Sequence, residues 1–221
     1  MKNTIQITLM ILFTINSYSQ TIKEIDSDAT KFCEYIKSTE NIKNDSIRIN
    51  EFYQTQFDPF LSNFEVEKVD KIARQLFYRL QRNCLDFSLL LDRLYPPKEN
   101  VIRITEKPKT KLTDKEIKEF WNRKTFKYFE NNGNETIVQL NINQWIDVFT
   151  DSTYSKLRYK VINNYEFELE FIESNNESRA NYNVVGDKFV YGIIEKKDSY
   201  YLMSSKIDSQ NHYEIFKLYF D

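Results

Sequence analysis

The stretch Tyr165–Phe171 (YEFELEF) decides the fold of the second half of this chain. Aromatic and leucine side chains alternate there with glutamates, and successive side chains of a strand point to opposite faces of a sheet. The pattern predicts a half-buried strand whose apolar residues face a core. Glu166, Glu168 and Glu170 form the other face, which we expect to be in water, as is typical of antiparallel sheets.

The same two-residue period recurs from about Lys124 to the end of the chain. Asn132-Gly133 is a strong hairpin signal, and similar turn signals separate the later segments. Further predicted strands cover Phe126–Phe129, Ile137–Ile142, Lys156–Ile162, Lys188–Glu195, Tyr200–Ser205 and Tyr213–Phe220. Seven or eight short strands in about 100 residues predict an antiparallel meander, closed as a barrel or a sandwich. A parallel α/β sheet is excluded, because no helical pattern separates the strands.

The first half has a helical period instead, with apolar residues recurring every three or four positions. One stripe includes Phe32 and Cys33, a less regular one covers Ser46–Phe57, and the clearest runs over Val69–Leu94. Pro59 is expected to end or kink the second helix, and Pro96-Pro97 stops the third. The pattern predicts a helical domain of about three helices over residues 20–97.

Residues 98–120 form a predicted basic linker and short helix. The segment Lys98–Lys127 contains 10 Lys and Arg residues but 5 Asp and Glu residues. The capping box Thr113–Glu116 predicts a short helix that ends near Asn122. We expect this segment to contact the acidic barrel domain, residues 121–221, with docking on an anionic polymer or lipid surface as the alternative.

Residues 1–19 have the three parts of a secretory signal peptide. Lys2 provides a positive charge, Ile5–Ile15 is largely apolar, and Ser17-Tyr18-Ser19 places small residues before a cleavage site at Ser19/Gln20. A membrane anchor is the alternative, but it needs about 20 apolar residues. No Cys follows the predicted site, which disfavours a lipid anchor. We expect an exported protein, periplasmic or extracellular, with no transmembrane segment in the mature chain.

Composition excludes several classes of protein. With 3 Gly, 4 Pro and 41% hydrophobic residues among 221, the chain is neither collagen-like nor disordered. Its 31 Lys+Arg and 33 Asp+Glu give no electrostatic case for nucleic acid. One His and two Cys are too few for a zinc site, and we expect no metal and no cofactor. Cys33 and Cys84 lie on apolar helix faces, and such a pair in an exported protein indicates a disulfide, with two buried thiols as the alternative.

The sequence contains no standard catalytic constellation. His212 is the one candidate base, and we expect it to be exposed in a polar turn; no G-x-S-x-G elbow is present. Gly133, Gly186 and Gly192 are too scattered for a phosphate-binding loop. Paired carboxylates for glycoside hydrolysis are harder to exclude, because acidic residues are common. We assign no catalytic residue.

The second half is rich in aromatic residues, among them Trp121, Trp145 and Tyr191. A small closed barrel either fills its interior with side chains or holds one small ligand. Side chains as large as these favour a filled interior. If the interior is open, the same three residues are the binding candidates.

The stretch Phe120–Tyr128 (FWNRKTFKY) resembles the opening strand of small exported proteins from Bacteroidetes, which typically reads aromatic–Gly–Lys–Phe–x–Tyr. Tyr165–Phe171 is similar to their Tyr-x-Leu strand, and Gly186-Asp187 and Tyr200-Tyr201 are similar to a later turn and strand. The resemblance covers about 100 residues and implies a lipocalin-like barrel. The usual Gly is missing beside Trp121, and the group has no assigned activity, so no functional residue is implied.

These features predict an α+β fold: a helical unit, then an antiparallel lipocalin-like β-barrel or sandwich. The leading hypothesis is an exported non-catalytic protein that binds a small apolar ligand or an envelope protein through the barrel or the crevice between helices and barrel. A hydrolase that cleaves envelope polymers with paired carboxylates and a structural envelope component are the alternatives. No nucleic-acid partner is expected.

Overall fold

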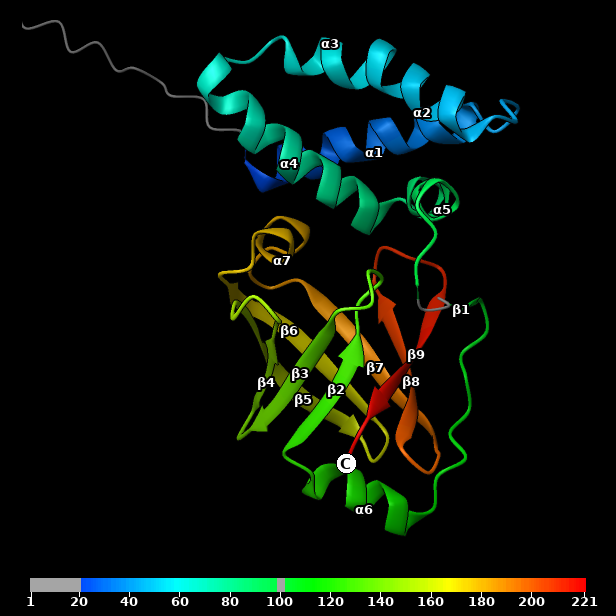
Figure 1. Cartoon of the computed structure of the whole chain (residues 1–221), viewed down its shortest axis with the longest axis vertical. Helices are drawn as coiled ribbons and strands as arrows, with labels where there is room; N and C mark the ends of the chain where they lie inside the picture. Colours follow the sequence, from blue (N-terminus) through cyan, green and yellow to red (C-terminus); the bar gives the residue numbers. More distant parts are fainter. Residues whose placement is uncertain (1–20, 99–101) are drawn as a thin grey trace, which may run out of the picture.

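The computed structural model describes residues 21–98 and 102–221. The predicted signal peptide 1–19 and its cleavage site at Ser19/Gln20 lie outside the described residues. Figure 1 shows a helical unit at the upper end, a β-barrel below it and helix α6 at the lower end. The predicted α+β fold is confirmed, because a helical region precedes a barrel of antiparallel strands. Of the helices in the described ranges, none is long and apolar enough to cross a membrane.

The helical unit is built on the apolar stripes seen in the sequence. Its elements are α1 (Ile22–Ser38), α2 (Asp45–Phe52), a π-helical segment (Tyr53–Phe57), α3 (Asp58–Leu61), α4 (Val66–Asn83) and α5 (Leu85–Leu94). Phe52, Leu76 and Phe87 from three of these helices are completely buried in one core. The predicted disulfide is confirmed between Cys33 and Cys84, whose Cα atoms lie 5.5 Å apart. A bridge that closes a loop of about 50 residues contributes roughly 4 kcal/mol in the chain-entropy treatment.

Two helix boundaries differ from the prediction. We expected one helix over Val69–Leu94, but α4 ends at Asn83 and α5 begins at Leu85, with Cys84 extended between them (φ −122°, ψ 103°). Apolar spacing runs on through this break because both helices pack on the same core. Pro59 does not end the second helix: it lies at the start of α3, where its missing N–H is tolerated.

Eight strands form a closed barrel in which neighbours along the chain pair antiparallel. They are β2 (Thr125–Phe129), β3 (Glu135–Asn141), β4 (Gln144–Val148), β5 (Tyr154–Asn163), β6 (Glu166–Ser174), β7 (Lys188–Lys196), β8 (Tyr200–Ile207) and β9 (Tyr213–Tyr219). β9 closes the barrel by pairing with β8 over most of its length and with β2 at Lys127↔Tyr219. β1 (Ile102–Ile104) pairs with the first residues of β9. The structure is therefore a barrel and not a sandwich.

β6 contains most of the alternating stretch from which the sheet was predicted. Phe167 and Leu169 are buried in the barrel, while Glu168 lies outside and pairs with a lysine of β7. Glu166 does not lie in water as expected, because the linker covers it: Lys107 Nζ lies 2.5 Å from its carboxylate, and the residue is 8% exposed. The basic linker thus contacts the barrel, as the charge pattern predicted.

Helix α6 (Asp114–Asn122) closes the lower end of the barrel. It begins at the predicted capping box, in which Thr113 and Glu116 bond each other's backbone N–H groups. Phe120 projects into the barrel and is completely buried, with its ring 5.0 Å from Phe126 and 5.1 Å from Tyr201. Figure 1 shows α6 lying across this end, so the lower half of the interior is a filled core.

The upper end of the barrel is covered by α7 (Glu177–Tyr182) and, beyond it, by the helical unit (Figure 1). Arg79 on α4 connects the two parts. Its guanidinium makes two hydrogen bonds to Asp26 of α1, pairs with Asp187 at the top of the barrel and bonds the Tyr182 carbonyl at 3.0 Å. This buried network fixes the helical unit over the open end of the barrel.

Candidate functional site

The upper half of the barrel contains a cavity of about 470 Å³, a size typical of small-molecule sites. Our expectation of a filled interior is therefore wrong for this half. The physical reason is side-chain size: Ser155 of β5 and Ser205 of β8 line the cavity. Lower on the same two strands, Tyr159 packs against Trp121 and Tyr201 against Phe120, both on α6. Small inward-facing residues near the upper ends of the strands leave space that the lower half does not have.

The cavity reaches the surface at the seam between β2 and β9. These strands share one described residue pair, Lys127↔Tyr219, near the lower end of the barrel. Above it, Phe129 and the exposed Lys217 line the cavity from opposite sides of the seam. β1 pairs with Tyr213, Glu214 and Ile215 on this edge of β9, so an opening through the seam lies between β1 and the Lys127↔Tyr219 pair.

The three aromatic residues singled out from the sequence lie in different places. Trp145 and Tyr191 both line the cavity, with ring centroids 5.6 Å apart in an edge-to-face arrangement. Trp145 stacks on the buried Phe167 at 5.8 Å and so forms part of the cavity floor. Trp121 lies at the lower end on α6, where its indole N–H donates to the Asn164 carbonyl at 3.0 Å. The structure therefore brings two of the three together and leaves Trp121 outside the cavity.

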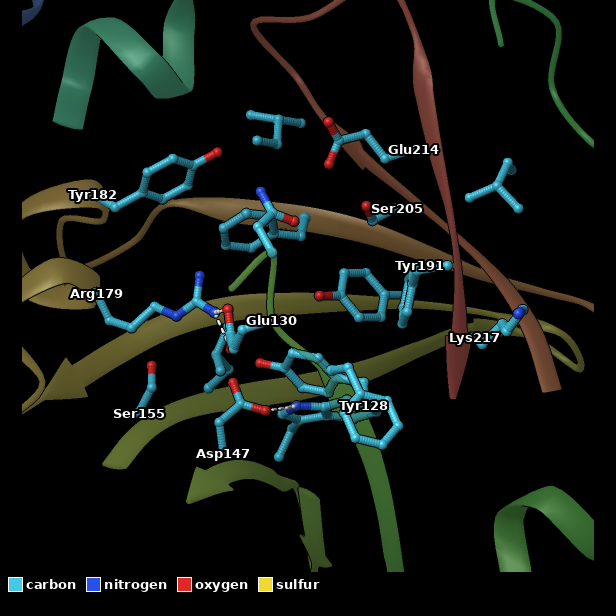
Figure 2. Close-up of a pocket in the computed structure, with 18 of the residues that line it drawn as sticks. Tyr128, Glu130, Asp147, Ser155, Arg179, Tyr182, Tyr191, Ser205, Glu214 and Lys217 are labelled. Carbon is cyan, nitrogen blue, oxygen red and sulfur yellow. Dashed lines mark hydrogen bonds and ion pairs between the residues drawn. The ribbon is translucent and has the colours of Figure 1, made fainter. Parts of the chain in front are cut away.

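Three charged groups converge on one wall of the cavity. Arg179 of α7 donates from Nη2 to both carboxylate oxygens of Glu130, at 2.5 and 2.7 Å. Asp147 of β4 accepts a hydrogen bond from the Trp145 indole N–H at 2.8 Å. Figure 2 shows the Asp147 carboxylate and the Tyr191 hydroxyl pointing to the side where Glu130 and Arg179 meet. The wall is thus an arginine with two nearby carboxylates, set among aromatic rings.

Burial controls the protonation of these groups. Loss of solvent raises the pKa of Asp147 from 3.8 to about 6, although Arg179 and the hydrogen bonds from Trp145 and Tyr128 act in the opposite direction. The pKa of the Tyr128 and Tyr191 hydroxyls is also raised by burial, so both stay neutral at physiological pH. The Asp147 carboxyl is the group in the cavity whose charge changes near neutral pH.

A second cavity, of about 530 Å³, lies in the crevice between the helical unit and the barrel. It adjoins the first, since Glu130, Arg179 and Glu214 line both. We expected His212 to be exposed in a turn, but it is 4% exposed and faces this crevice, because the helical unit covers the turn. Its Nε2 lies 3.9 Å from Glu214 Oε1, and neither ring nitrogen has a hydrogen-bond partner in the described ranges.

Asp147, Glu130 and Arg179 were missed by sequence reasoning. Asp147 follows Trp145 by two residues, which is the spacing of one strand face, so extending the two-residue period to Gln144–Val148 would have placed both side chains inward. Asn176 caps α7, and its position before Glu177 was a usable helix-start signal for the element that carries Arg179. No local signal indicates that Glu130 meets Arg179, since 48 residues separate them.

Metal binding has little support in the described part of the chain. The one group of three potential ligands close enough to share an ion is Cys33, Cys84 and Asp86, and the disulfide occupies both sulfur atoms. The cavity offers instead an aromatic and carboxylate lining suited to holding an organic molecule.

Comparisons with known proteins add no assignment. No protein-family model matches this chain, and neither a curated protein nor a solved structure matches it.

Proposed function

We propose that this is an exported, non-catalytic binding protein whose barrel holds one small molecule in the cavity that Trp145, Asp147 and Tyr191 line. The observation that carries the proposal is the contrast within one barrel: its lower half is filled, and its upper half holds a cavity of about 470 Å³ with aromatic walls and buried polar groups. Pockets with mostly apolar walls and a few converging polar groups are typical ligand sites.

Export is part of this proposal and rests on two observations. The sequence of residues 1–19 has the pattern of a secretory signal. The Cys33–Cys84 disulfide is of the kind that persists in oxidising compartments. A ligand met in the periplasm or outside the cell would reach the cavity through the seam between β2 and β9.

Binding is tested with N-phenyl-1-naphthylamine, a neutral fluorophore that brightens in apolar sites. Ser205→Phe places a large ring in the cavity and is expected to weaken probe binding at least tenfold. Lys206→Phe is the matched control, because adjacent residues of a strand point to opposite faces and Lys206 points outward. Equal binding by both variants and the unchanged protein would contradict the proposal.

A hydrolase that acts on envelope polymers is the second candidate. It is favoured by one observation: Glu130 and Asp147 line the same cavity, and the pKa of Asp147, about 6, suits a general acid. Against it, Glu130 is held by two hydrogen bonds from Arg179 and is not free to serve as base or nucleophile. Release of reducing sugar from purified cell-wall glycan, lost in Asp147→Asn, would establish the hydrolase and overturn the non-catalytic proposal.

A further inference from the structure

We propose that the ligand of the barrel cavity is a small organic cation, a protonated or quaternary amine, seated beside Asp147 and against the rings of Trp145 and Tyr191. This inference rests on the proposed binding function and names its ligand class.

The first argument is the balance of charge inside the barrel. Glu130, Asp147 and Glu214 line the cavity, and Arg179 is the cation on the same wall, since the other two lining cations, Lys98 and Lys217, are exposed at its rim. Glu130 takes both hydrogen bonds that Arg179 Nη2 donates. Glu214 forms an ion pair with Arg103 on the crevice side, where Arg103 Nε lies 2.9 Å from Glu214 Oε1. Among the lining carboxylates in the described ranges, Asp147 is left without a salt bridge, although the charge of Arg179 acts on it from a longer distance.

The second argument concerns what Asp147 does bond. Its hydrogen bonds come from the neutral indole N–H of Trp145 and the hydroxyl of Tyr128. The residue is 7% exposed, so water does little to stabilise its charge. A buried carboxylate is costly unless it is paired, and a cation in the adjoining space would pair it.

The third argument is the aromatic wall. Tyr191 lies 5.6 Å from Trp145, 5.5 Å from Phe216 and 6.5 Å from Phe189, measured between ring centroids. The face of an aromatic ring carries negative electrostatic potential and attracts ammonium groups, and aromatic boxes recognise quaternary amines in this way. Rings and carboxylate thus favour the same ligand charge.

Other ligand charges fit this lining less well. An anion would approach Asp147 and Glu130 and would have to compete with Glu130 for Arg179. A neutral apolar molecule would cover Asp147 without pairing it. An organic cation is the one class that gains from the rings and compensates the carboxylate.

The test compares two molecules of nearly equal shape, choline and 3,3-dimethylbutan-1-ol, which differ in the charge of the quaternary centre. Their dissociation constants are measured by calorimetry at pH 8 with the full mature chain, residues 20–221. We expect choline to bind roughly tenfold more tightly than the alcohol, because its charge is stabilised both by the Asp147 carboxylate and by the aromatic faces. In Asp147→Asn, which keeps an oxygen to accept from Trp145, the preference should fall below threefold.

Glu168→Gln is the matched control, because it removes one carboxylate from the outer face of β6 and should keep the full preference. Equal affinity for the two molecules, no binding of choline, or an unchanged preference in Asp147→Asn overturns the cation assignment. Binding of N-phenyl-1-naphthylamine distinguishes a failure of the ligand class from a failure of the proposed binding function. If that probe still binds and Ser205→Phe still blocks it, the cavity function stands and the ligand class alone is wrong.

Discussion

The two halves of the barrel use the same eight strands in different ways. In the lower half, Phe126, Phe167 and Tyr201 pack around Phe120 and are at most 2% exposed. In the upper half, the serines Ser155 and Ser205 and several polar side chains share the lining with aromatic rings, and a cavity remains. The strand pattern does not distinguish the halves, because both alternate inward and outward. What differs is the size and polarity of the inward residues, so we expect stability to depend mainly on the lower half and propose that the upper half binds the ligand.

The largest expected effect on stability comes from removing a buried side chain of the filled lower half. Phe120→Ala empties a fully buried site and is expected to lower the free energy of unfolding by about 3–5 kcal/mol. Phe189→Ala, which enlarges a cavity that already exists, should cost about 1–2 kcal/mol. Urea unfolding followed by barrel fluorescence measures both. Equal losses of unfolding free energy in the two variants would contradict the distinction between a filled lower half and an open upper half.

The second prediction concerns the buried carboxyl at the top. Asp147 has a pKa of about 6 in the folded state against 3.8 as its ordinary value, so between about pH 4 and 6 the folded state holds the extra proton. Its contribution to the free energy of unfolding therefore falls as pH rises through that window, by about 3 kcal/mol in all.

Asp147→Asn removes this titration while keeping an acceptor for Trp145. Relative to the unchanged protein, the variant should gain about 2 kcal/mol in unfolding free energy between pH 4 and pH 7. Groups remote from Asp147 titrate alike in both proteins and cancel in the difference. Urea unfolding at several pH values measures it, and a difference that does not change with pH would mean that Asp147 is not a desolvated acid.

A smaller effect on stability is expected at the start of α6, the helix that carries Phe120 into the lower half of the barrel. Thr113→Ala removes the side chain that accepts from the Glu116 N–H and should cost about 1 kcal/mol. Thr113→Ser keeps the hydroxyl and should restore most of the stability. Binding of N-phenyl-1-naphthylamine should be unchanged in both variants, because α6 lies at the opposite end from the cavity; a loss of probe binding would show that the two halves are coupled.

The smallest effect on stability is expected from Ser205→Phe, which fills the cavity without removing a core contact. We expect the free energy of unfolding to change by less than about 1 kcal/mol in either direction. Thermal unfolding beside the Lys206→Phe control measures this. A much larger loss would indicate that no space exists for the added ring and that the upper half is already packed.

The sequence was sufficient for the antiparallel strands because alternation is a local signal, but it left a barrel and a sandwich open, since closure depends on the pairing of β9 with β2 and β8. Tyr165–Phe171 and its neighbours predicted strands that β6 and the adjoining elements confirm. The disulfide was also predictable, since both cysteines lie on apolar stripes. The break at Cys84 was not, because apolar spacing is the same on both sides of it.

The candidate site depends on contacts that a local pattern does not contain. Arg179 and Glu130 come from separate elements, and the helical unit buries His212 from above. Aromatic content predicted that Trp145 and Tyr191 face the interior. The prediction that side chains fill the whole interior was wrong for the upper half. The space depends on the serines beside them, whose small size was not weighed against the large rings.

A crystal structure of residues 20–221 grown with choline tests the central claim most directly. The account predicts that the upper half of the barrel is open and that the trimethylammonium group lies beside the Asp147 carboxylate, against the rings of Trp145 and Tyr191. A barrel in which Tyr191 and Phe216 have collapsed into this space, leaving no room for a ligand, would contradict it.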